Sequence, residues 1–124
     1  MLRKKQDVDW KENNGRLVAL IRERKIEEAK ALGQEMVDYV DRKYRKDHPE
    51  KATTYNNMGM VFMLARDYDL AETCFQEALT MRRRIFGREH NEVAVILLNL
   101  VQLYKVQAEA IMFLNRVETP VDPV

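Results

Sequence analysis

Apolar residues recur along the chain at the three- and four-residue spacing of amphipathic helices, and no segment alternates with a period of two. One apolar stripe consists of Ile26, Ala29, Met36, Val37, Val40 and Tyr44. A second stripe of the same kind consists of Tyr68, Ala71, Phe75, Ala78, Leu79 and Ile85. The fold class that this pattern predicts is all-α.

The middle of the chain carries clear signals for the ends of two helices. Pro49 suits the first position of a helix, because its missing N–H would have no partner there. Asp47 or His48 would then cap the helix. We expect this helix to run from Pro49 to about Ala65, followed by a short turn and a second helix from about Tyr68.

An internal repeat organises the chain. Residues 48–52 and 90–94 share three identities 42 positions apart, and the same offset pairs Asn57 with Asn99 and Tyr44 with Phe86. A fixed period of this length is typical of stacked repeat proteins. We divide the chain into a basic N-terminal tail, a repeat domain and a C-terminal tail: residues 1–7, 8–117 (units of about 6–47, 48–89 and a partial 90–117) and 118–124.

The middle unit resembles the tetratricopeptide repeat. Where that family has Leu-Gly, Tyr, Tyr, Ala, Phe and Ala, this chain has Met58-Gly59, Phe62, Tyr68, Ala71, Phe75 and Ala78. The 42-residue period and the segment 85–90 resemble the kinesin-light-chain-like variety of the repeat. The resemblance implies antiparallel helix pairs, about five helices in all, stacked as a short right-handed superhelix.

In that family the first helix of each pair lines a concave face that binds peptides. The resemblance implies that the positions on this face are Asn14, Val18, Ile21, Thr53, Asn57, Met60, Leu64, Val95, Asn99, Gln102 and Val106. A carboxamide can pair with both polar groups of a peptide backbone, and the resemblance implies this role for Asn57 and Asn99. In the alternative interpretation these side chains satisfy their own repeat or solvent. We expect a protein or peptide partner, and asparagines that face outward and contribute little to stability.

The third unit departs from the repeat. Residues 107–110 are good helix formers at the place where the middle unit turns, and Pro120 stands where Ala78 would recur. We therefore expect the fifth helix to continue from about Asn91 to Val117; the alternative is a turn near Gln107. The continued helix would expose an apolar surface for self-association as a homodimer, formed by Ile111, Met112, Phe113, Leu114 and Val117.

Composition narrows the functional classes. The chain has 124 residues, a formal net charge of +1, one cysteine and no serine. We find no nucleophile–base pair, carboxylate pair or glycine-rich phosphate loop, so we expect no enzyme activity and no cofactor. His48 and His90 occupy equivalent loop positions, which favours helix capping over metal binding.

Charge and hydropathy bear on partners and location. Near-neutrality argues against a nucleic-acid partner, although the basic helix ends, Arg42–Lys46 and Arg82–Arg84, leave binding of RNA or an acidic partner as an alternative. Without a secretory signal or an uninterrupted apolar span, we expect a cytoplasmic protein with no membrane partner. The function we predict is a non-catalytic interaction scaffold that also self-associates; a purely structural oligomerisation module is the other alternative.

Overall fold

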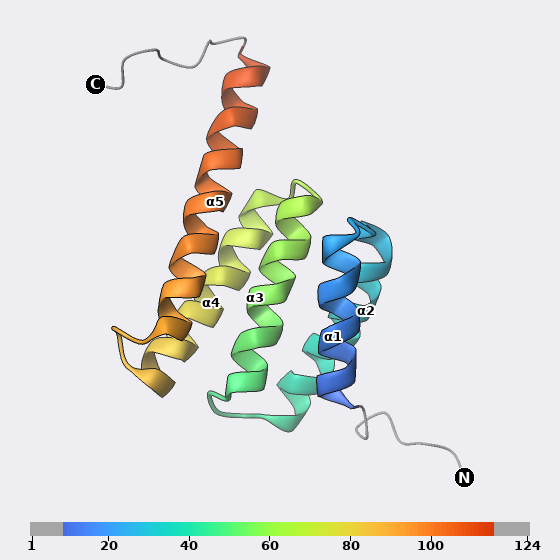
Figure 1. The fold of residues 1–124 in the computed structure, drawn as a ribbon, viewed down its shortest axis with the longest axis vertical. Helices are drawn as coiled ribbons and strands as arrows, with labels where there is room; N and C mark the ends of the chain where they lie inside the picture. Colours follow the sequence, from blue (N-terminus) through green and yellow to red (C-terminus); the bar gives the residue numbers. More distant parts are fainter. Residues whose placement is uncertain (1–8, 116–124) are drawn as a thin grey trace.

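The computed structural model describes residues 9–115, which form five helices and no strand (Figure 1). Two antiparallel pairs come first and a single long helix follows: α1 (Trp10–Arg22) with α2 (Ile26–Lys43), α3 (Pro49–Leu64) with α4 (Tyr68–Phe86), and then α5 (Asn91–Leu114). The all-α prediction is confirmed. Val117 and the two predicted tails lie outside the described residues.

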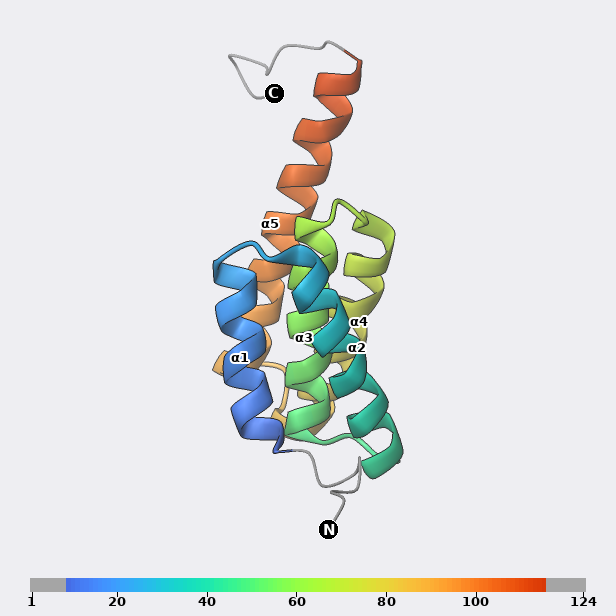
Figure 2. The ribbon, with the colours of Figure 1, turned by 90° about the vertical axis from the view of Figure 1, so that its right-hand side faces the viewer.

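The helices form two layers. In Figure 1 α1, α3 and α5 lie side by side nearer the viewer, with α2 and α4 behind them, and the turned view of Figure 2 separates the same two layers. Helix α3 packs against both α1 and α5, and also against α2 and α4. The first helices of the three units therefore share one face of the molecule, which we call the α1–α3–α5 face.

Two histidines begin α3 and α5 in the same way. The Nδ1 atoms of His48 and His90 each accept a hydrogen bond of 3.0 Å from the backbone N–H two residues later. Each ring also stacks on the aromatic residue four positions earlier, Tyr44 or Phe86, with ring centroids 3.7 and 4.6 Å apart. The predicted capping role is confirmed, and the 42-residue repeat extends to these stacks.

Close packing of α3 on α4 depends on small residues. A Cβ atom placed on Gly59 would lie 2.5 Å from Cε1 of Phe75, well inside contact distance. Ala71 and Phe75 of α4 are fully buried in the same region. One apolar core lies between α3, α4 and α5, and a second joins α1 and α2 to α3, with Ala71, Phe75, Ala78, Leu79, Val93, Ile96, Leu100 and Leu103 in the first and Leu17, Ala29, Leu32, Met36, Met58 and Val61 in the second.

The third unit does not form a helix pair within the described residues. As predicted, α5 continues past Gln107 without a turn and extends beyond the rest of the molecule (Figure 1). Sequence explains this difference, because Val101 and Phe113 occupy the positions that correspond to Gly59 and Ala71 in the second unit. Two large side chains there prevent the close helix approach that α3 and α4 make.

Candidate functional site

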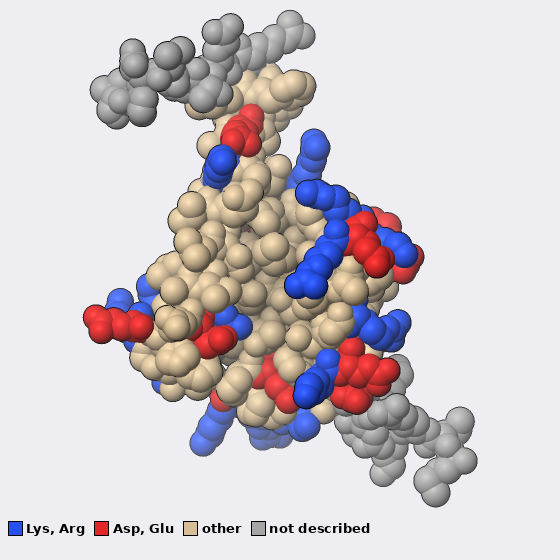
Figure 3. All heavy atoms as spheres, viewed as in Figure 1, with Lys and Arg blue, Asp and Glu red and all other residues tan. Residues whose placement is uncertain are grey.

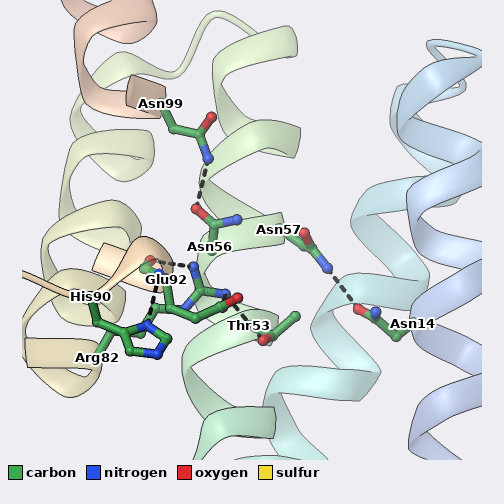
Figure 4. Close-up of polar contacts among 8 residues, drawn as sticks. All are labelled: Asn14, Thr53, Asn56, Asn57, Arg82, His90, Glu92 and Asn99. Carbon is green, nitrogen blue, oxygen red and sulfur yellow. Dashed lines mark hydrogen bonds and ion pairs between the residues drawn. The ribbon is translucent and has the colours of Figure 1, made fainter. Parts of the chain in front are cut away.

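Asparagines join the first helices of successive units (Figure 4). Nδ2 of Asn57 on α3 donates a hydrogen bond of 2.7 Å to Oδ1 of Asn14 on α1. Nδ2 of Asn99 on α5 donates one of 2.9 Å to Oδ1 of Asn56 on α3. Both bonds span 43 positions, so the same contact recurs from one unit to the next, and we call the two bonds the asparagine ladder.

The ladder has no continuation at either end of the domain. In the first unit Gly15 occupies the position of the donor Asn57, and it has no side chain that could donate a hydrogen bond. In the third unit Leu98 occupies the position of the acceptor Asn56. Its side chain is exposed and has no oxygen that could accept a hydrogen bond. A further unit of the same kind could not bond to α5 through this contact.

The ladder corrects one expectation about these residues. Asn57 is only 8% exposed, and its amide is engaged with the neighbouring unit rather than directed outward. The expectation that the Asn57 side chain faces outward is wrong, and we now expect its replacement to lower stability, because Asn14 would lose its hydrogen-bond partner. Asn99 is half-buried. Sequence reasoning missed Asn56, although Asn14 and Asn56 show the same 42-residue offset as Asn57 and Asn99.

The other residues of the predicted peptide-binding set lie on α1, α3 and α5 and differ in exposure. Val95 and Gln102 are exposed, whereas Val18, Ile21, Met60, Leu64 and Val106 are half-buried. Figure 3 shows that charged side chains gather at the edges of the α1–α3–α5 face, while its middle over α3 and α5 is uncharged. A binding role for this set stays a prediction.

Thr53, also in that set, is held by Arg82 of α4. The guanidinium donates to Oγ1 of Thr53 at 3.2 Å and to the backbone oxygen of Glu92 at 2.9 Å, and it forms a 3.3 Å ion pair with the Glu92 carboxylate (Figure 4). Burial lowers the pKa of Arg82, while the charge of Glu92 opposes this shift. Arg82 therefore fixes the start of α5 against α3 and α4.

The contacts of Arg82 argue against a basic binding surface formed by Arg82–Arg84. Arg82 is 5% exposed and belongs to the interior, not to an accessible cluster. Arg84 is exposed, but it forms an ion pair with Asp47 at 3.5 Å. The expectation that Arg82–Arg84 act together as a basic edge is therefore wrong for Arg82.

Helix α5 carries most of the exposed apolar surface of residues 9–115. Eight of the nine large apolar side chains exposed there lie on it: Val95, Leu97, Leu98, Val101, Tyr104, Ile111, Phe113 and Leu114. The predicted self-association residues Ile111, Phe113 and Leu114 are exposed, Met112 is half-buried, and Val117 is outside the described residues. By length and composition alone α5 could also cross a membrane. Four residues of α5 pack into the core: Val93, Ile96, Leu100 and Leu103.

Reactive chemistry is scarce among the described residues. No group of three or more His, Cys, Asp or Glu side chains there could hold a metal ion. Burial raises the pKa of the Cys74 thiol to about 11, with a smaller contribution from Glu77. The thiol is therefore protonated at neutral pH and is a poor nucleophile.

Comparison with known proteins identifies the family. The sequence model of the tetratricopeptide repeat matches residues 50–119, more than half of the chain. The chain belongs to the tetratricopeptide repeat family. No curated protein and no solved structure matches it. Tetratricopeptide repeats generally mediate protein–protein interactions and are typically non-catalytic scaffolds. Membership of the kinesin-light-chain-like variety stays a prediction.

Proposed function

We propose that this protein is a non-catalytic, cytoplasmic scaffold that binds a peptide or protein segment on the α1–α3–α5 face and self-associates through α5. The observation that supports peptide binding is the uncharged middle of this face, which lies over α3 and α5, the first helices of the second and third units. The observation that supports self-association is the exposed apolar surface of α5. Membranes and nucleic acids are not partners in this proposal.

The chemistry of the face indicates what kind of segment fits. Met60 and Leu64 on α3 are half-buried, and Val95 on α5 is exposed, so the surface is apolar and can adapt its shape. Gln102 adds an exposed carboxamide that can donate to and accept from a peptide backbone. The Asn57 amide group is already bonded within the ladder. The segment we propose is therefore uncharged or apolar, and Gln102 takes the role that the sequence assigned to Asn57.

A random dodecapeptide library displayed on phage provides a probe that works before the natural partner has been identified. Peptides selected on the full-length protein would be synthesised, and their affinities measured by fluorescence polarisation. Two variants form a matched pair, because Val95 is 45% exposed on the proposed face and Leu70 is 46% exposed on α4 outside it. We expect Val95→Lys to weaken binding at least tenfold and Leu70→Lys to leave it unchanged.

Two results would contradict peptide binding on this face. One is that no peptide binds the wild type more tightly than a scrambled control. The other is that Leu70→Lys weakens binding as much as Val95→Lys does. Circular dichroism of both variants checks that each is folded, since both residues are exposed and neither belongs to a core cluster.

A further inference from the structure

One stripe of α5 has the spacing of a coiled-coil seam. Six residues follow one another at alternating intervals of three and four: Ala94, Leu97, Val101, Tyr104, Ala108 and Ile111. All six are apolar or aromatic and all are exposed. Such a spacing keeps the stripe facing one partner helix over several turns. We call these six residues the α5 seam.

The α5 seam lies where the second helix of a repeat would pack. Val101, near its middle, corresponds to Gly59, and Gly59 lies against Phe75 of α4 in the second unit. One edge of the seam contacts α4 itself, because the Tyr104 hydroxyl donates to the Glu72 carboxylate. Within the described residues no helix covers the seam, so the place of α4 in the third unit is open.

We propose that the α5 seam pairs with the α5 seam of a second copy of this chain, antiparallel, about a two-fold axis that passes between Gln102 and Leu103. This inference rests on the proposed self-association and specifies its geometry. The antiparallel direction is the one that α4 takes along α3. Each copy then supplies the helix that the third unit of the other copy lacks.

The side-chain sizes along the seam fit this register. In an antiparallel pair about that axis, Ala94 faces Ile111 of the second copy, Leu97 faces Ala108, and Val101 faces Tyr104. Each layer combines a smaller residue with a larger one, which is how facing positions interdigitate without voids. The overlap covers the whole of α5, about 36 Å at 1.5 Å per residue. The seam is thus complementary to itself in this orientation.

Two other arrangements fit less well. In a parallel pair each residue would face its own copy, so Ala94 and Ala108 would leave gaps while Tyr104 would crowd the interface. In a head-to-tail stack, a further unit could not extend the asparagine ladder, because Leu98 occupies the position of the acceptor Asn56. A closed two-fold dimer avoids both problems.

Disulfide trapping with single-cysteine additions to the full chain tests the register. Ala94→Cys and Ile111→Cys are purified separately, mixed in equal amounts and oxidised. We expect an intermolecular disulfide in the mixture and none in either variant alone. In the proposed dimer two copies of position 94 lie about 25 Å apart along the helix, beyond the reach of a disulfide. In the first control, Val95→Cys, one residue away from the seam, is mixed with Ile111→Cys in place of Ala94→Cys. In the second, wild-type protein is oxidised alone to show whether Cys74 forms an intermolecular disulfide.

A second variant pair tests the seam without cysteine. Val101→Glu places charges near the two-fold axis, and we expect it to weaken dimerisation at least tenfold in light scattering with unchanged circular dichroism. Val95→Glu, on the opposite side of α5, should leave the dimer intact. Both residues are exposed, so neither change disturbs a core.

The outcomes separate this inference from the proposed function. Disulfides within each single variant but not between them would indicate a parallel pair and overturn the inference, while self-association would stand. A dimer unaffected by Val101→Glu would overturn it in the same way. A monomeric wild type would overturn both the inference and self-association, but not peptide binding. Flotation of the wild type with phosphatidylcholine vesicles, abolished by Val101→Glu, would show that a membrane covers the seam and would overturn the inference.

Discussion

In the second unit α3 is covered on its α4 side, whereas in the third unit α5 has no second helix in residues 9–115. The two units begin alike, with a histidine cap on a stacked aromatic ring and an asparagine bonded to the previous unit. They diverge where Val101 replaces Gly59 and Phe113 replaces Ala71. Loss of two small residues therefore accompanies the change from a helix pair to one long helix with an open apolar face.

The largest expected effect comes from placing valine, the residue of the third unit, at position 59 of the second unit. Gly59→Val places a branched side chain where even a Cβ would lie 2.5 Å from the Phe75 ring. We expect the free energy of unfolding to fall by about 2–3 kcal/mol because α3 and α4 must separate. Urea unfolding followed by circular dichroism measures this change.

The reverse substitution is the control. Val101 is exposed on α5, so in protein dilute enough to be monomeric we expect Val101→Gly to cost only the lower helix propensity of glycine, about 1 kcal/mol or less. Equal losses from Gly59→Val and Val101→Gly would show that close packing does not distinguish the two units.

Removal of Arg82 should uncouple the start of α5 from the second unit. Arg82→Gln loses the hydrogen bond to the backbone of Glu92 and its ion pair with that carboxylate. We expect a loss of about 1.5–3 kcal/mol in the free energy of unfolding, as for hydrogen bonds to charged groups. Arg84→Gln is the matched control, because it removes an exposed ion pair. We expect it to lower the free energy of unfolding by less than about 0.5 kcal/mol. A similar loss in both variants would contradict the role given to Arg82.

The asparagine ladder predicts a smaller, pairwise effect. A double-mutant cycle of Asn14→Ala and Asn57→Ala should give a coupling energy of about 0.5–1.5 kcal/mol, because the two amides share one hydrogen bond. Asn14→Ala combined with Asn99→Ala should give additive losses, since Asn99 bonds to Asn56 instead. Additivity in both cycles would mean that the ladder does not hold the units together.

The smallest expected effect concerns Cys74, which lies on the covered side of α4. Burial raises its pKa from 9.0 to about 11, so the folded state keeps the proton that the unfolded state loses first. Its contribution to stability is full below pH 9 and is lost as pH rises towards 11. Ellman's reagent at about pH 8 should therefore react much more slowly with Cys74 than with the added thiol of Val95→Cys. Equal rates would show that the core cluster shared by α1, α2 and α3 does not cover this thiol.

Much of the fold follows from local signals in the sequence. Pro49, the histidine caps and the helical stripes predicted the helices of the second unit, and residues 107–110 predicted that α5 would not turn. The candidate site was less predictable. Periodicity places Asn57 on the same helix face as its neighbours, but whether that face is open depends on how near α1 comes, which is a tertiary property. The same holds for Arg82, whose position in a basic run gave no sign of burial.

The central claim is that the open side of α5 is covered by a second copy of the chain. Light scattering coupled to size exclusion, at tens of micromolar protein, measures this directly on the full chain and on a version that ends at Lys105. We expect the full chain to have twice its own mass of 14.7 kDa and the shortened version to be monomeric, because it lacks Ala108 and Ile111 of the α5 seam. A full chain with the mass of one copy would contradict the claim.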